Sequence, residues 1–97
     1  METTFDTIRR LAVDTLGVPE VTLLRARTLR EAGIDSLASL DLLDAIEAHF
    51  GIHIPAEELA ELDSLRGFAA VAERLVAREA ARYEAYHATQ YEAHHEA

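Results

Sequence analysis

The residues best suited to chemistry form a short segment near the middle of the chain, Gly33-Ile34-Asp35-Ser36-Leu37. Asp35 and Ser36 are both good helix-start residues, because a side-chain oxygen can accept from the free backbone N–H groups of a first turn. A helix start also carries a partial positive charge, which stabilises an attached phosphate. The segment therefore predicts a serine at a helix start, beside a carboxylate, where a phosphate ester is stabilised. The alternative interpretation is that Ser36 is only a helix cap.

The residues after Ser36 predict the helix that such a site needs. Large apolar residues recur at helical spacing through residues 36–50, with acids between them, and Gly51 is typical of a helix end. The expected apolar face consists of Leu37, Leu40, Leu43, Ile46 and Phe50, and the acids between them are Asp41, Asp44 and Glu47.

This part of the chain resembles the acyl carrier protein family, from about Leu11 to Val76. The matching runs are Gly33-Ile34-Asp35-Ser36-Leu37, Leu40-Asp41-Leu42, Ala45-Ile46-Glu47 and Phe50-Gly51-Ile52-His53-Ile54-Pro55. In that family an Asp-Ser-Leu motif opens the second helix, and its serine carries 4′-phosphopantetheine. The Asp-Ser-Leu triplet alone is weak, but its distance from the Phe-Gly-Ile-x-Ile-Pro run makes the match specific. The resemblance implies attachment at Ser36, with Gly33, Asp35 and Leu37 as its motif.

The resemblance also implies a carrier without catalytic activity of its own. A phosphopantetheinyl transferase, with magnesium in its own site, would transfer the group from coenzyme A to Ser36, and the new thiol would hold acyl groups as thioesters. Acyl-loading, condensing and modifying enzymes with basic docking surfaces would then meet Asp41, Asp44 and Glu47.

Departures from the family pattern bear on the pathway. Ala38 and Ala48 replace acids that are common in fatty-acid carriers, and Asp44 replaces an apolar residue. These changes favour polyketide or other specialised acyl metabolism over a housekeeping fatty-acid carrier. A discrete aminoacyl or peptidyl carrier of a nonribosomal peptide pathway is the other alternative, although those carriers more often have two glycines where this chain has Gly33 and Ile34.

Two readings from other classes stay open on the residues alone, a serine enzyme and an unmodified helical adaptor. A nucleophilic serine needs a base and an oxyanion site. His49 lies almost four turns from Ser36 on the same expected helix, and no other histidine forms a motif with it. Only modification data separate the adaptor from the carrier.

Composition narrows the class of partner. Ninety-seven residues make one small domain, and the net charge of −9 argues against nucleic acid and for basic protein surfaces. The chain has no cysteine, so the thiol of any thioester must belong to a prosthetic group. The sequence shows no membrane-spanning apolar run and no signal peptide, so we expect a cytoplasmic monomer.

The expected fold is all-α, a four-helix bundle of the acyl-carrier type with a long first loop and a short third helix. Thr3 or Thr4 would cap the first helix and Gly17 would end it; Val18–Ala32 would form the loop, and Asp63 or Ser64 would cap the last helix. We expect Ile52–Ile54 to be a loop, because it is too short to build a sheet alone. The expected core includes Phe5, Ile8, Leu16, Leu43, Ile46, Phe50, Ile54, Leu59, Phe68, Ala72 and Leu75.

The family pattern ends at about Ala77, so we divide the chain into a carrier domain, residues 1–77, and an extension, residues 78–97. The extension is rich in Ala, Glu, Tyr and His, and we expect a fraying helix or disorder there. His87, His94 and His95 lack a cysteine or a suitably spaced carboxylate, so a solvated tail is favoured over a metal site.

Overall fold

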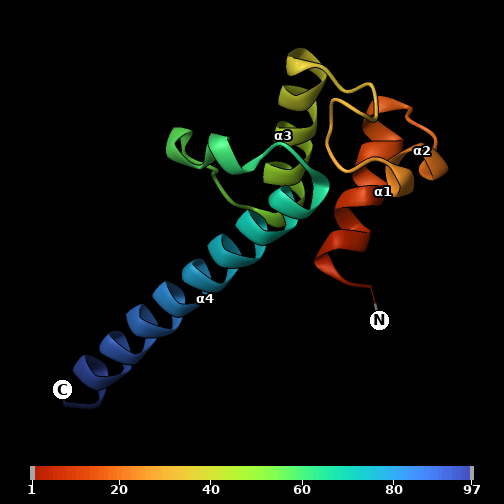
Figure 1. Ribbon diagram of the computed structural model, residues 1–97. Helices are drawn as coiled ribbons and strands as arrows, with labels where there is room; N and C mark the ends of the chain where they lie inside the picture. The colour runs from red at the N-terminus through yellow and green to blue at the C-terminus, as the bar shows by residue number, and fades with distance from the viewer. Residues whose placement is uncertain (1, 97) are drawn as a thin grey trace.

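The computed structural model describes the backbone of residues 2–96 and the side chains of residues 2–86. Its elements are α1 (Thr4–Leu16), α2 (Glu20–Arg25), α3 (Ser36–Phe50), a 3-10 helix η1 (Ala56–Glu61) and α4 (Leu65–Glu96). Helix α1 lies against α3 and α4, and η1 lies against α4 (Figure 1). The expected all-α bundle with a short third helix is confirmed, and Ile52–Ile54 is a loop.

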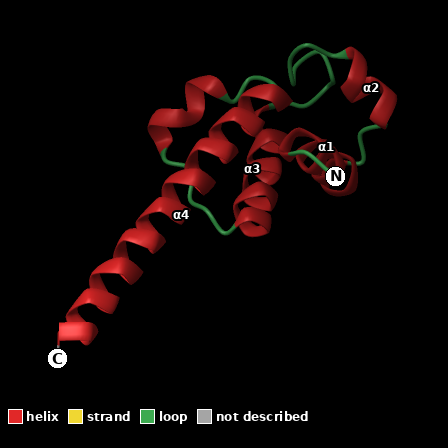
Figure 2. Ribbon diagram, turned by 90° about the horizontal axis from the view of Figure 1, so that it is seen from below, coloured by secondary structure: helices red, strands yellow, loops and turns green. Residues whose placement is uncertain are grey.

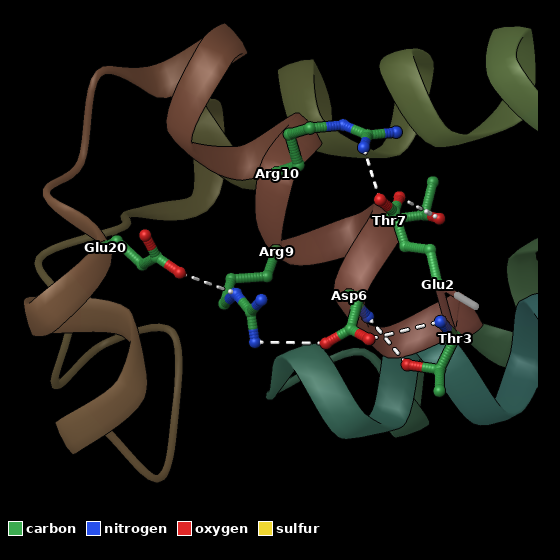
Figure 3. A network of polar contacts seen from close by, with 7 residues as sticks. All are labelled: Glu2, Thr3, Asp6, Thr7, Arg9, Arg10 and Glu20. Carbon is green, nitrogen blue, oxygen red and sulfur yellow. Dashed lines mark hydrogen bonds and ion pairs between the residues drawn. The ribbon is translucent and has the colours of Figure 1, made fainter.

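A polar network fixes the start of α1 and joins it to α2 (Figure 3). Thr3 and Asp6 form a capping box, in which each side chain accepts from the other residue's backbone N–H at 3.1 Å. The hydrogen bond from the Thr3 backbone N–H, and after it the Thr3 side chain, hold the pKa of the Asp6 carboxyl below its ordinary value. Arg9 lies 3.2 Å from Asp6 and 3.3 Å from Glu20 of α2. The ion pair between Arg9 and Glu20 therefore links α1 to the short second helix.

The other expected helix boundaries are confirmed. Gly17 and Gly51 follow α1 and α3 with φ of 69° and 65°, a left-handed conformation that glycine adopts without strain. Ser64 Oγ accepts from the backbone N–H of Gly67 at 3.0 Å and so caps the first turn of α4.

The first connection contains a helix, α2, that the sequence did not predict. We expected the whole of Val18–Ala32 to be a loop. Leu23 and Leu29 are buried, but Val21 and Leu24 are more than half exposed. A six-residue helix with one buried residue is too short to show a periodic apolar pattern, which is why it was missed.

Most of the expected core is confirmed. Six residues are buried, Ile8, Ile46, Ile54, Phe68, Ala72 and Leu75, and four partly buried ones pack against them, Phe5, Leu16, Leu43 and Phe50. The prediction for Leu59 is wrong, because this side chain is 50 % exposed. The 3-10 helix η1 contributes no buried residue, and Leu62, just after it, anchors this segment in the core instead.

The phase of α3, that is, the face that it turns toward the core, differs from the expected one. Leu37 and Leu40 are 75 % and 52 % exposed, whereas Leu42 is completely buried. Large apolar residues occur on more than one side of this helix, so the helical period fits two faces. Burial selects the face that holds Leu42 and Ile46, and leaves Leu37 and Leu40 in solvent.

Glu47 fastens the loop that follows α3. Its Oε2 accepts from the backbone N–H of Ile54 at 2.7 Å and lies 3.3 Å from Nδ1 of the exposed His53. Only 22 % of the Glu47 side chain is exposed, whereas the docking role that the family resemblance implies needs an exposed acid. This contact satisfies a backbone donor next to the buried Ile54 side chain and so holds the loop in place.

A glycine lets α4 approach η1 closely. A Cβ atom at Gly67 would lie 1.9 Å from the carbonyl oxygen of Glu61, so any other residue would push the two segments apart. Arg74 of α4 also pairs with Glu58 and lies 3.6 Å from Glu61. Packing at this point therefore requires glycine, although glycine weakens a helix interior.

Helix α4 continues far beyond the bundle. Leu75 is its last buried residue among the described side chains, yet the helix runs to Glu96. It leaves the bundle on the side opposite to α2, and the molecule measures 58 × 30 × 18 Å (Figure 2). Tyr83 and Tyr86 are exposed. The side chains of His87, Tyr91, His94 and His95 lie outside the described residues. None of the described helices has the length and apolar composition that a membrane span requires.

Paired substitutions test the phase of α3. Leu42→Ala should lower the free energy of unfolding by about 2–5 kcal/mol, because it leaves a cavity in the core. Leu40→Ala removes the same atoms from an exposed position and should change it by only about 0.5 kcal/mol. Urea unfolding followed by circular dichroism measures both. Equal losses for the two variants would contradict the observed phase.

Candidate functional site

Asp35, rather than Ser36, caps α3. Asp35 has extended backbone angles, φ −83° and ψ −176°, and its Oδ1 accepts from the backbone N–H of Ala38 at 2.9 Å. Ser36 is the first residue of the helix, and its side chain is exposed. Within the described part of the chain, no hydrogen bond engages its hydroxyl. The interpretation of Ser36 as only a cap is therefore wrong, and its Oγ is left available for a covalent bond.

The neighbouring serine is engaged differently. Ser39 Oγ donates to the backbone carbonyl of Asp35 at 2.9 Å, and the Ser39 backbone N–H donates to the same oxygen at 2.9 Å. Of the two serines at this helix start, Ser39 has a structural partner and Ser36 does not. The two side chains therefore form a natural pair for comparison.

Backbone hydrogen bonds hold the segment that leads into the site. Ile34 is buried, and its N–H donates to the carbonyl of Leu29 at 2.9 Å. Gly33 before it has φ 80°, a left-handed conformation in which a side chain would be strained. The N–H of Leu29 in turn donates to the carbonyl of Asp63 at 2.9 Å. The site is thereby connected to the residues just before α4.

A hollow of about 750 Å³ opens beside Ser36. Residues 33–36 and Ser39 form one side, Thr28, Leu29 and Arg30 form a second, and Leu62 and Asp63 form the third. These residues fit a phosphopantetheine arm. The hydroxyl is available for the ester, the helix start favours the phosphate, and the hollow has both polar and apolar walls.

The exposed face of α3 combines acids with large apolar side chains. Asp41 and Asp44 are exposed, and the exposed Leu37 and Leu40 lie on the same side of the helix. Glu47, the third expected docking acid, faces the following loop. The sequence interpretation missed the exposure of the two leucines because it placed them on the apolar face of the helix. The adjacent Leu42 and Leu43 were the signal that a second face was available.

The histidines of the described part of the chain lie away from Ser36. Histidine is absent from the residues that line the hollow. His49 lies about 20 Å away along α3, at a rise of about 1.5 Å per residue, and its ring packs edge-on against Phe50. An activated serine needs a base within hydrogen-bonding reach, and among the described residues no histidine lines the hollow beside Ser36.

Comparison with known proteins agrees with this geometry. Residues 6–72 match the family described as phosphopantetheine attachment site. The match covers more than half of the chain and includes the whole of α3 together with the hollow beside Ser36.

Individual relatives include proteins that are named acyl carrier proteins. The chain is 32 % identical to an acyl carrier protein of Campylobacter hominis over 73 % of this chain and 91 % of that protein. It is 39 % identical to the acyl carrier protein AcpXL of Mesorhizobium japonicum over 60 % of this chain, spanning 63 % of that relative's length. It is also 36 % identical, over 64 % of this chain, to 2 % of a non-reducing polyketide synthase, ausA, of Aspergillus calidoustus. With an attachment-site match that includes the free serine of α3, the chain belongs to the phosphopantetheine-binding acyl carrier protein family.

Proposed function

We propose that Ser36 Oγ is the atom to which 4′-phosphopantetheine is attached. The observation that carries this proposal is the cap of α3: because Asp35 satisfies the Ala38 N–H, the Ser36 hydroxyl is exposed and has no partner among the described residues. The start of α3 stabilises the phosphate of the ester, and Gly33 and the buried Ile34 fix the direction from which the chain enters the site.

The chain then acts as a carrier and not as an enzyme. The prosthetic group, when bound, supplies the thiol that the chain itself lacks, and this thiol holds an acyl group as a thioester. The protein's own residues position the group, offer the hollow between Leu29, Ile34 and Leu62, and present a surface to partner enzymes. Tethering raises the effective concentration of the cargo at each enzyme that docks.

We assign the partner surface to the exposed face of α3. Asp41 and Asp44 attract the basic docking surfaces of the transferase and the acyl-processing enzymes, and Leu37 and Leu40 supply apolar contact beside Ser36. Glu47 contributes less than expected, since its carboxylate already accepts from Ile54. Its main contribution is to the loop.

The cargo we favour is an acyl group of polyketide or other specialised metabolism. Support comes from the three positions that depart from the fatty-acid carrier pattern, Ala38, Asp44 and Ala48, and from the similarity to a segment of a polyketide synthase. An aminoacyl or peptidyl carrier and a housekeeping fatty-acid carrier are the alternatives. The similarity to proteins named as acyl carriers favours an acyl cargo.

The two serines test the attachment site. After incubation with coenzyme A, magnesium and a phosphopantetheinyl transferase, intact mass should show one added group on the unmodified chain and on Ser39→Ala. Ser36→Ala should gain none, while its free energy of unfolding changes by only about 0.5 kcal/mol because Asp35 provides the cap. A gain of mass by Ser36→Ala would disprove the site.

Charge reversal tests the docking face. Asp41→Arg together with Asp44→Arg should raise the KM of the transferase by roughly tenfold, and the difference should shrink as salt is added, because the attraction is screened. Asp14→Arg together with Glu73→Arg, two exposed reversals on α1 and α4 that change the net charge equally, is the matched control and should have little effect. Equal effects of both changes would show that net charge matters rather than this face.

The group that the modified carrier accepts, and the enzyme that elongates it, distinguish the polyketide, fatty-acid and aminoacyl pathways. The modified carrier should accept a malonyl group from malonyl-coenzyme A through a malonyltransferase, which mass spectrometry detects. It should then be elongated faster by a polyketide elongating enzyme than by a fatty-acid one. Loading by an amino-acid-adenylating enzyme instead would establish the aminoacyl alternative, and faster fatty-acid elongation would establish the housekeeping one.

The domain boundary is also a proposal: residues 1–77 form the carrier domain and residues 78–97 an extension. Tyr83 lines a shallow groove with Phe50, Ile52 and Val76, so the extension has some contact with the bundle. Because Tyr83 is 63 % exposed, removing residues 78–97 should lower the free energy of unfolding by less than about 2 kcal/mol.

The truncated protein should still be labelled at Ser36. Thermal unfolding and mass spectrometry measure the two properties, and Tyr83→Ala in the full chain isolates the contribution of that side chain. A larger loss of stability, or failure of labelling, would show that the extension is an integral part of the domain.

A further inference from the structure

Positive charge gathers at one end of this acidic protein. The chain has a net charge of −9. Arg25 nevertheless ends α2, Arg27 and Arg30 follow it within five residues, and Arg66 lies in the first turn of α4. None of these four has an ion pair within the described residues. Other arginines are paired: Arg9, Arg10, Arg74 and Arg82. Arg78, on the exposed part of α4, also has no ion pair within the described residues, but the other unpaired arginines are concentrated where the first connection meets α4.

Three of these arginines line a groove of about 460 Å³, and Arg30 lines the hollow beside Ser36 instead. Its walls include the buried Leu23 and Leu29 together with Phe5, and Arg25, Arg27 and Arg66 also line it. The guanidinium of Arg66 lies over the Phe5 ring, 4.8 Å from its centroid. The groove thus has apolar walls with guanidinium groups among them, one of them held by an aromatic ring.

The nearest acids do not neutralise this charge. Glu20 pairs with Arg9 at 3.3 Å. Glu31 accepts from the backbone N–H of Arg27 at 2.8 Å, and no ion pair joins it to a guanidinium of the described chain. The groove therefore presents net positive charge, although most of the molecule is acidic.

Exposed apolar side chains lie on α2, which contributes to the groove. Leu24 lines the groove, and both it and Val21 are more than half exposed on α2. The groove also adjoins the hollow of Ser36, because Thr28 and Leu29 line both. Figure 1 shows α2 and the connection that follows it on the side of the bundle away from the protruding end of α4.

We propose that this groove is a second docking surface, which binds an acidic segment of a partner protein with apolar side chains at its centre. The guanidinium groups of Arg25, Arg27 and Arg66 match carboxylates, and Leu24 with the groove walls matches the apolar anchors. The acidic face of α3 attracts basic surfaces, so the two ends of the carrier select partners of opposite charge. A partner bound at the groove leaves that face free for another enzyme.

A second copy of this chain is a poorer occupant. Its acidic α3 face would fit the groove, but such a contact joins two different surfaces and would not close into a dimer. Two chains that each carry a charge of −9 also repel each other. Nucleic acid is disfavoured for a similar reason, since phosphates beyond the groove would meet acidic surface.

The test maps binding of a synthetic peptide to the full, unmodified chain labelled with ¹⁵N. The probe is a short peptide that alternates pairs of glutamates with leucines at helical spacing, and its control replaces each glutamate with lysine. Amide shifts should change at residues 20–30 and 64–67 with the glutamate peptide, should diminish as salt is added, and should be absent there with the lysine peptide.

Two matched double charge reversals test whether the arginines of the groove bind the peptide. Arg25→Glu with Arg27→Glu should weaken peptide binding by about tenfold or more, whereas Arg78→Glu with Arg82→Glu, an equal change of charge on exposed α4, should weaken it by about twofold or less. Circular dichroism verifies that both variants fold. Leu24→Ala should also weaken binding, because it removes an exposed anchor without opening the core.

Several results would overturn the proposal. They are undetectable binding, shifts centred on α3, equal effects of the two double reversals, and equal binding of the lysine peptide. Self-association in sedimentation that Arg25→Glu with Arg27→Glu abolishes would assign the groove to a second copy, and stronger binding of a short DNA strand would assign it to nucleic acid. None of these measurements depends on modification, and Ser36→Ala should bind the peptide as the unmodified chain does.

Discussion

The hydrogen bond from the Ala38 backbone N–H to the Asp35 carboxylate determines what Ser36 can do. A helix start must satisfy its first N–H groups, and serine is as good a cap as aspartate. If Ser36 filled that place, its hydroxyl would be engaged in a local contact and its residue would lie outside the helix. With Asp35 as the cap, Ser36 takes the first helical position, keeps the favourable field of the helix start and leaves its oxygen exposed.

The same helix serves the core and the surface through different side chains. Leu42 and Ile46 are fully buried, whereas Leu37 and Asp44 face solvent. Glu47 lies between these roles: its chemistry suits a docking acid, but its carboxylate holds the following loop at Ile54. The number of acids along α3 thus overstates the size of the docking surface, because one of them, Glu47, accepts a hydrogen bond from the backbone instead. The unpaired arginines lie on other elements, which separates the two signs of charge in space.

Much of the fold could be predicted from the sequence, because helix ends depend on local chemistry. Gly17 and Gly51 were assigned from residue type and position, and the caps were narrowed to Thr3 or Thr4 and to Asp63 or Ser64. Ser36 was singled out by the resemblance to a family motif. Burial was harder to predict. The phase of α3 was missed because two apolar faces compete and only packing with other helices selects one. Helix α2 was missed because a single buried residue gives no period, and Leu59 was misplaced because a 3-10 turn at the surface buries nothing.

Helix α4 also affects how the whole molecule moves in water. A compact chain of this length would have a radius of gyration of about 12.5 Å, whereas that of this protein is 16.7 Å. The difference comes from a rod of helix attached to a small bundle. Such a particle tumbles anisotropically and encounters more drag than a sphere of equal mass. Gel filtration calibrated with globular standards therefore overestimates its mass, and a single chain elutes where a larger assembly is expected.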